Sequence, residues 1–300
     1  MAAHVRRINS QDKIATGILT AIVGLVLLIL AAIVIYILVA GAGKLFDVDF
    51  LTSKPQQFKA GGGIGPELFN SFYLLFLTLV ISVPLSLGAA IYLSQYAPEN
   101  WVTSVAKTII ETLSSLPSIV VGLFGFLFFV LTMGWGFSVI AGAVALTMFN
   151  IPILVRTCQQ ALEDVPRSQR DAGLAMGLTR WETTIHVLLP AAMPAIVTGI
   201  VLSAGRVFGE AAALIFTAGQ SAPVLDFTCF DFSSPSCPWN IFRPAETLAV
   251  HIWKINSEGV VPDLEAISNG TAAVLMVCIL AFNLIARFVG KLLERRLTSE

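Results

Sequence analysis

The sequence predicts an all-α integral membrane protein with six transmembrane helices. Of its 300 residues, 56% are hydrophobic and only 12% are charged, and the mean hydropathy is +0.83. A soluble domain carries about 25% charged residues. The apolar residues are gathered in blocks, and a helix needs about 20 of them to cross a bilayer. These apolar blocks make the lipid bilayer the expected environment. The net charge of -1 gives no indication of a nucleic-acid partner.

Six apolar blocks have about the length of a membrane span. They cover residues 14–40, 68–95, 109–132, 135–155, 191–216 and 270–289. The first block follows a basic head with Arg6, Arg7 and Lys13, as in a signal peptide. A signal core has only about 7–15 apolar residues, so we predict an uncleaved first span. Pro117 and Gly122 lie within the third block and are expected to distort it.

The orientation follows from the basic residues, which favour the cytoplasmic side. With the N-terminus inside, the cytoplasmic segments carry Arg6, Arg7, Lys13, Lys107, Arg156, Arg167, Arg170, Arg180, Arg287, Lys291, Arg295 and Arg296. The outer segments carry only Lys44, Lys54, Lys59, Arg243 and Lys254. An even number of spans returns both termini to the cytoplasm. It places the polar segment 159–190 inside and the segment 217–269 outside.

The cytoplasmic segment 159–190 has the pattern of two short helices separated by a glycine. Pro166 can begin a helix, and residues 168–176 form a short amphipathic stretch. Gly177 is expected to end that helix. Thr179, with Glu182 three residues later, predicts a capping box for a second helix that leads back into the membrane. Physics alone leaves open whether this hairpin lies on lipid or docks on a partner protein.

A spaced motif in this segment resembles the EAA loop of the binding-protein-dependent ABC-importer permease superfamily. The matching positions begin with the cluster Asp171, Ala172 and Gly173. Gly177 follows four residues after this cluster, and Leu189 and Pro190 end the motif. Asp replaces Glu, Gly replaces Ala and Val replaces Ile, with spacing intact. The resemblance implies a type I permease fold whose cytoplasmic coupling helices dock on a separate ATPase subunit. It also implies a bacterial inner-membrane location.

The domain organisation expected from this resemblance has three parts. Residues 1–67 hold the cytoplasmic N-terminus, the first span and the first outer loop. Residues 68–290 form the ABC transmembrane type-1 permease domain, and residues 291–300 form a cytoplasmic tail. The chain is not expected to be an enzyme, because its Gly-Lys pairs, Gly43-Lys44 and Gly290-Lys291, are each followed by Leu rather than Ser or Thr. It needs no cofactor of its own; a partner ATPase would bind ATP and Mg²⁺.

The fifth apolar block carries two charged residues, Arg206 and Glu210. Charges inside a span are costly and usually face a cavity or a partner. At i, i+4 spacing the two can form an ion pair on one helix face. Two interpretations remain open: a structural pair that fixes helix packing, or an arginine that attracts an anion and is restrained by Glu210. Ser118, in the distorted third block, is a further candidate for the substrate pathway.

Three stretches resemble the PstA-type permeases of phosphate importers. They are residues 111–125, residues 161–202 and the Gly-Arg-x-x-Gly-Glu element within residues 205–219. The resemblance implies import of inorganic phosphate by a heterodimer with a related permease, an ATPase dimer and an extracytoplasmic phosphate-binding protein. Import of another oxyanion, such as sulfate or molybdate, is the main alternative. A secondary transporter is less well supported, since internal repeats are absent from the sequence.

The remaining candidates are two cysteines of the predicted outer segment, two histidines and Glu111. Cys229 and Cys237 face an oxidising exterior in this topology and are predicted to form a disulfide. His186 and His251 stand too isolated in the sequence to predict a metal site, and we predict none. Glu111, at the start of the third block, is expected to serve helix packing or the interface rather than substrate binding.

Overall fold

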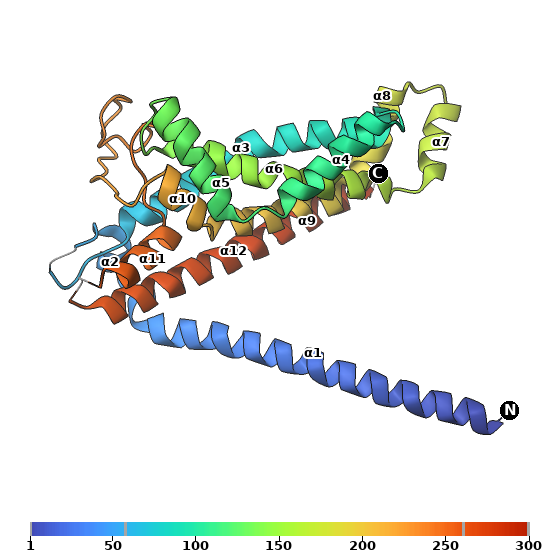
Figure 1. Cartoon of the computed structure of the whole chain (residues 1–300), viewed down its shortest axis with the longest axis horizontal. Helices are drawn as coiled ribbons and strands as arrows, with labels where there is room; N and C mark the ends of the chain where they lie inside the picture. Colours follow the sequence, from blue (N-terminus) through green and yellow to red (C-terminus); the bar gives the residue numbers. More distant parts are fainter. Residues whose placement is uncertain (1, 57–58, 260–261, 299–300) are drawn as a thin grey trace.

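A computed structural model describes residues 2–56, 59–259 and 262–298, and in these ranges the protein is helical with no β-strand. Figure 1 shows a bundle from which one long helix, α1, projects. The longer helices are α1 (Ala2–Leu45), α3 (Gly65–Ile91), α4 (Trp101–Ser114), α6 (Val139–Glu163), α9 (Leu189–Phe208), α11 (Leu248–Glu258) and α12 (Leu264–Thr298). The shorter ones are α2 (Val48–Thr52), α5 (Ser118–Gly125), α7 (Arg167–Ala175), α8 (Arg180–Thr183), α10 (Ala212–Thr217) and the π-helical segments η1 (Tyr92–Tyr96), η2 (Phe126–Thr132) and η3 (Thr184–Leu188).

The bundle is built around α3, α6 and α9. Helix α3 packs along α6, and α9 packs against both α6 and α12. Side chains from these helices and from α10 are buried together, among them Leu74, Val139, Leu146, Ala204 and Leu214. Because lipid tails are as apolar as these side chains, close packing rather than exclusion from water holds the helices together.

The prediction of six spans is confirmed, with one span broken. Five helices are long and apolar enough to cross a membrane, and a sixth span is the bent pair of residues 101–114 and 118–132, whose two halves meet at 98°. The helix of the predicted block 109–132 starts earlier than expected, because α4 begins at Trp101 with Asn100 as its N-cap. Pro117 ends the first half, since proline cannot continue the backbone hydrogen bonds of α4.

The fifth apolar block is also interrupted. Helix α9 ends at Phe208, and the short α10 begins at Ala212. Gly122 of α5 lies so close to α10 that a Cβ atom there would stand 2.7 Å from the Cα of Ala213. Helices α5 and α10 therefore touch through their backbones, which is the use that membrane proteins make of small residues.

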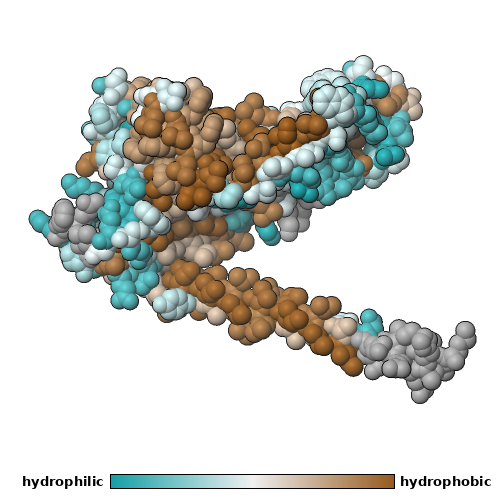
Figure 2. All heavy atoms as spheres, viewed as in Figure 1, coloured by the Kyte–Doolittle hydropathy of each residue, from teal (hydrophilic) through white to brown (hydrophobic). Residues whose placement is uncertain are grey.

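Helix α1 contacts the body only near its C-terminal end. There it crosses α12, and a Cβ on Gly41 would collide with the carbonyl of Asn269 and the methyl of Ala273. The most apolar window of α1 is 0% buried in this chain. Figure 2 shows the corresponding continuous apolar surface along the projecting helix. An apolar surface of this extent requires lipid or another membrane protein as its neighbour.

The predicted outer segment 217–269 is partly helical, because it contains α11 and the start of α12. It is fastened to α3 by Arg243, which is 1% exposed. Its guanidinium donates to Asn70 Oδ1 at 2.7 Å and to the carbonyl of Pro238 at 3.0 Å. Burial lowers the pKa of Arg243 to about 10, which leaves the side chain protonated at neutral pH.

Both ends of the chain lie at the same end of the molecule as α7 and α8. In Figure 1 the start of α1, the end of α12 and the pair α7–α8 lie to the right, whereas α2 and α11 lie to the left. The arrangement agrees with an even number of spans. The predicted tail 291–300 continues α12 as far as Thr298, and residues 299 and 300 lie outside the described part.

Candidate functional site

The predicted coupling segment forms two short helices at the end of α6. Helix α7 ends beside Gly177, whose φ of 87° requires the left-handed region that glycine adopts without strain. The N–H of Leu178 closes the turn on the carbonyl of Gly173 at 3.2 Å. Thr179 and Glu182 form the predicted capping box, in which Thr179 Oγ1 accepts from the N–H of Glu182 and the Glu182 carboxylate accepts from the N–H of Thr179. The local sequence therefore determined this turn.

The small residues of the motif have two different surroundings. Gly173 is buried, and a Cβ there would lie 2.9 Å from Cγ2 of Thr183 on the following helical segment. Its small size serves packing within the chain, and its contact with a partner surface stays a prediction. Ala172 and Asp171 are exposed and remain free for such a contact. Met176, at the end of α7, is 84% exposed.

A groove lies beside this exposed surface. Its volume is about 590 Å³, and its walls come from η1 and the links after it, α6 and α7, including Gln95, Glu99, Arg167, Arg170 and Asp171.

The second coupling helix is continuous with a membrane span. Helix α8, the π-helical turn η3 and α9 form one run, Arg180–Phe208, of 29 residues, or about 43 Å at 1.5 Å per residue. Leu189 and Pro190 open α9, where proline is tolerated in the first turn. Pro190 does not interrupt the run, because no turn separates η3 from α9.

Arg206 lies in the last turn of α9 at the far end of this run. Its side chain is exposed in this chain, and its guanidinium carbon stands 4.3 Å from the ring centroid of Phe149 on α6. An aromatic face holds an arginine by cation–π attraction and leaves its N–H donors free at the rim of the guanidinium. Within the described ranges, no carboxylate lies at ion-pair distance from Arg206.

The expected pair between Arg206 and Glu210 is not formed. Helix α9 ends at Phe208 with Gly209 as its cap, so the four-residue spacing no longer places the two side chains on one helix face. Glu210 instead accepts a hydrogen bond from the N–H of Ala213 at 3.2 Å, at the beginning of α10. Its charge thus stabilises the N-terminus of a short helix.

A buried polar chain that the sequence analysis missed lies next to Arg206. Asn150 donates to Ser82 Oγ at 3.2 Å, and Ser203 donates to the Asn150 side-chain oxygen. The three residues come from α3, α6 and α9. Asn150 follows the Phe149 that holds Arg206, and Ser203 precedes Arg206 by one helical turn. An asparagine in an apolar helix was the only signal, and its partners are fixed by tertiary packing.

The other predicted residues lie elsewhere. Ser118 is half-buried and begins α5, which packs on α10 and α6, and no hydrogen bond joins it to Arg206 in the described structure. Glu111 is exposed and stands 3.6 Å from Arg156 of α6, an ion pair that agrees with its predicted packing role. Such exposed pairs contribute at most about 1 kcal/mol.

The predicted disulfide is absent from this structure. Cys229 and Cys237 are both free thiols. The Cys237 thiol points to the backbone carbonyl of Cys229, 3.3 Å away, and the Cys229 thiol is turned toward the carbonyl of Asp231.

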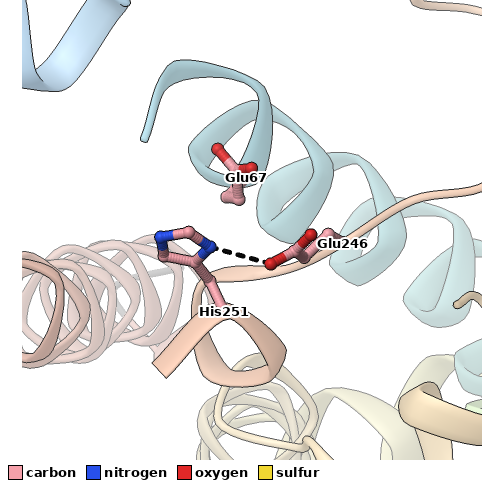
Figure 3. A group of neighbouring side chains, drawn as sticks. All are labelled: Glu67, Glu246 and His251. Atoms are coloured by element: carbon pink, nitrogen blue, oxygen red, sulfur yellow. Dashed lines mark hydrogen bonds and ion pairs between the residues drawn. The ribbon is translucent and has the colours of Figure 1, made fainter. Parts of the chain in front are cut away.

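A second group of ionisable residues meets at the end of the bundle opposite α7 and α8. Figure 3 shows Glu67, Glu246 and His251 directed toward one another. His251 Nδ1 lies 2.7 Å from Glu246 Oε1. His251, which stands isolated in the sequence, has two carboxylates as neighbours in the fold, because the 183 residues of chain between Glu67 and His251 fold back to bring them together. Polar residues at the entrance of an apolar helix, Glu67, Asn70 and Ser71, were a signal at i, i+3, i+4 spacing.

The fold and the coupling segment define a class: a membrane-embedded permease subunit that works with separate soluble subunits. The family described as binding-protein-dependent transport system inner membrane component matches residues 82–299, and the chain belongs to that family. A probable ABC transporter permease of Bacillus subtilis, YqgI, is 50% identical over 288 residues, 96% of this chain and 98% of that protein. The phosphate transport system permease PstA of Yersinia pestis is 33% identical over 246 residues, 80% of this chain and 76% of that protein.

Solved structures agree on the fold. A chain of the MetNI methionine ABC transporter, in an inward-facing conformation, superposes with a TM-score of 0.56 at 17% identity, covering 77% of this chain and 94% of that one. The protein is thus a type I ABC-importer permease subunit, a multi-pass protein of the bacterial inner membrane. In this class, ATP hydrolysis belongs to a partner ATPase.

Proposed function

We propose that this chain is the permease subunit of an ATP-driven importer of inorganic phosphate. The observation that carries the proposal is Arg206: an exposed guanidinium in the last turn of a span, held on Phe149 and without a carboxylate partner in the described ranges. The identity of 33% to a protein named as a phosphate transport permease supports the same substrate.

The chemistry of Arg206 suits a tetrahedral oxyanion. Its planar guanidinium presents paired N–H donors, which match two phosphate oxygens. Stacking on Phe149 fixes the plane of the guanidinium without using its donors. Because Glu210 is engaged with the N–H of Ala213, it leaves the arginine charge unneutralised. A single arginine offers an anion transient binding, as a translocation pathway requires, and Ser118 remains a secondary candidate along that pathway.

The coupling segment would dock on an ATPase dimer that binds ATP and Mg²⁺. Its exposed surface is formed by Asp171, Ala172 and Met176, next to the groove of about 590 Å³. Closure of the ATPase would push α7 and α8. Since α8 is continuous with α9, the movement would reach Arg206, about 39 Å from Arg180 along the helix.

The remaining partners follow from the exposed surfaces. A second, related permease would cover Arg206 and part of the apolar surface of α1, so that the pathway lies between two subunits. We place both termini in the cytoplasm and the segment 217–269 outside, as the basic residues indicate. An extracytoplasmic phosphate-binding protein would contact this outer segment, in which Phe227, Phe230 and Phe232 are 58%, 76% and 64% exposed.

Transport of another oxyanion is the second candidate, because sulfate and molybdate also present oxygens to an arginine. The test is uptake of labelled phosphate by membranes that contain the full complex, with sulfate and molybdate as competitors. We expect unlabelled phosphate to inhibit the uptake of labelled phosphate, and we expect sulfate and molybdate not to inhibit it. Uptake of labelled sulfate that phosphate does not inhibit would refute the proposed substrate. Membership of the ABC-importer family argues against the secondary transporter considered from the sequence.

Substitution of Arg206 tests its role. Arg206→Gln should assemble normally but lower phosphate uptake by about 10- to 100-fold, the loss of a charge-assisted hydrogen bond. Arg206→Lys should also be impaired, because an ammonium lacks the paired donors. Glu210→Gln is the matched control: its amide oxygen can still accept from Ala213, so uptake should persist. Normal uptake by Arg206→Gln, relative to assembled complex, would show that the pathway charge lies elsewhere.

A further inference from the structure

Three buried ionisable side chains from separate segments meet at the outer end of the bundle. Glu67 lies in the first turn of α3, Glu246 in the segment before α11, and His251 in α11 (Figure 3). Their exposures are 0%, 1% and 4%. One ligand atom from each residue lies within 4.8 Å of the other two. Such burial of ionisable groups is costly unless they are paired or bind a metal.

Glu67 is the member of this cluster that lacks a partner. Both of its carboxylate oxygens are buried, and neither has a hydrogen-bond partner in the described structure. The nearby cation is already engaged: Lys254 Nζ donates to Glu246 Oε2 at 3.0 Å and to the carbonyl of Gln220 at 2.7 Å. The other Glu246 oxygen faces His251. An unpartnered carboxylate aimed at a carboxylate and an imidazole requires either a proton or a cation between them.

We propose that Glu67, Glu246 and His251 bind one divalent transition-metal ion of the zinc class. An imidazole nitrogen with carboxylate oxygens is a donor set that zinc accepts, whereas Ca²⁺ and Mg²⁺ prefer oxygen alone. One oxygen of Glu67, one oxygen of Glu246 and one ring nitrogen of His251 supply three donors and leave the fourth tetrahedral position open. The hydrogen bond from Lys254 to the second Glu246 oxygen is the outer contact that orients a ligating carboxylate.

The required rearrangement is small. Zinc bonds of about 2.0–2.2 Å place neighbouring donors about 3.3 Å apart in a tetrahedral site. The cluster, with its donor atoms within 4.8 Å, needs only to contract, while the 2.7 Å contact between His251 Nδ1 and Glu246 Oε1 opens slightly. The side chains come from α3, α11 and the segment that joins α11 to the aromatic part of the outer segment, so no helix needs to move as a body.

The consequence of metal binding would be structural. The same three segments are already joined by hydrogen bonds from Asn70 to the carbonyl of Glu246, at 3.0 Å, and from the N–H of Leu248 to Ser71 Oγ, at 2.9 Å. A metal would add a strong link to this interface and fix the outer segment on α3. The metal belongs to the architecture of the outer surface and is separate from the pathway at Arg206.

The test measures metal content of the whole complex purified from membranes with its partner subunits. The protein is stripped with a chelator, equilibrated with micromolar free Zn²⁺ and analysed by mass spectrometry of the elements. Wild type should hold one more zinc per copy of this chain than Glu67→Gln or His251→Gln, whose zinc affinity should fall by about tenfold or more. His186→Gln, which alters an exposed histidine at the other end, is the matched control. Excess Ca²⁺ or Mg²⁺ should not displace the zinc.

Two readouts keep the proposal falsifiable if a variant fails to assemble. X-ray absorption of the wild-type complex should show zinc bound by oxygen and imidazole nitrogen without sulfur. Limited proteolysis of the outer segment should slow on addition of Zn²⁺ in wild type and in His186→Gln. Wild-type complex that takes up no zinc would overturn the proposal and show that Glu67 is simply held protonated. Equal zinc content in wild type and Glu67→Gln would overturn it as well.

Discussion

The contact between Gly173 and Thr183 offers the sharpest test of how the coupling segment is built. A Cβ on Gly173 would lie 2.9 Å from Thr183 Cγ2 and 3.2 Å from its Oγ1, whereas carbon atoms rest about 3.5–4.0 Å apart. Thr183 is 1% exposed, so it has little room to give way. Gly173→Val should therefore force α7 away from α8 at a cost of about 1–3 kcal/mol.

A second substitution should rescue the first. Thr183→Ala removes the Cγ2 methyl that clashes and a buried hydroxyl that has no hydrogen-bond partner. Removing an unpartnered hydroxyl loses no hydrogen bond, so this change alone should be nearly neutral. In the double variant the valine can occupy the vacated space. We expect the double variant to be about 1–2 kcal/mol more stable than the sum of the two single effects predicts.

The assay for this cycle is the thermal midpoint of the purified permease, together with recovery of the ATPase subunit. Gly173→Val should lower both, and Gly173→Val with Thr183→Ala should restore both. Ala172→Val is the control: Ala172 is exposed on the same helix, so it should leave the midpoint unchanged while weakening ATPase recovery. Strictly additive effects of the two substitutions would show that α7 and α8 do not touch as described.

Three further predictions concern other parts of the chain. Gly177→Ala should destabilise the coupling turn by about 1–2 kcal/mol, because alanine is strained at positive φ, and Gly177→Asn should be milder; thermal midpoints measure both. In a cysteine-free background, an impermeant thiol reagent on intact cells should label Ser233→Cys but not Ser168→Cys, and the reverse pattern would refute the orientation. Alkylation of the denatured, unreduced chain should modify all four cysteines, whereas two unmodified cysteines would reveal a disulfide between Cys229 and Cys237.

The coupling segment could be predicted from the sequence because its structure is local. Gly177 ends α7 through its own backbone freedom, and the capping box of Thr179 and Glu182 satisfies backbone groups three residues apart. These interactions depend on neighbours in the chain and on no tertiary contact. The close contact of Gly173 with Thr183, a residue on a different helical segment, was not evident from the local sequence.

The partner of Arg206 could be identified only once the end of helix α9 was known. A pairing with Glu210 is reasonable if the helix continues, but α9 ends at Phe208. The termination is not evident in an apolar run, because hydropathy continues through Leu214 and Ile215. It depends on α10 packing against α5 through Gly122 and Ala213. Once the helix ends, Glu210 caps α10 and Arg206 stacks on Phe149 instead.

The sequence by itself determined the membrane environment, the six spans, the coupling turn and the family. Each depends on composition or on the spacing of residues close together in the chain, so each could be predicted from hydropathy and backbone geometry. Only the tertiary structure decided which polar groups meet: Arg206 on Phe149, Asn150 between Ser82 and Ser203, and Glu67 beside His251. The physical reason is that a buried polar group is satisfied by whatever neighbour the packing of helices brings within about 3 Å, and that neighbour can come from anywhere in the chain.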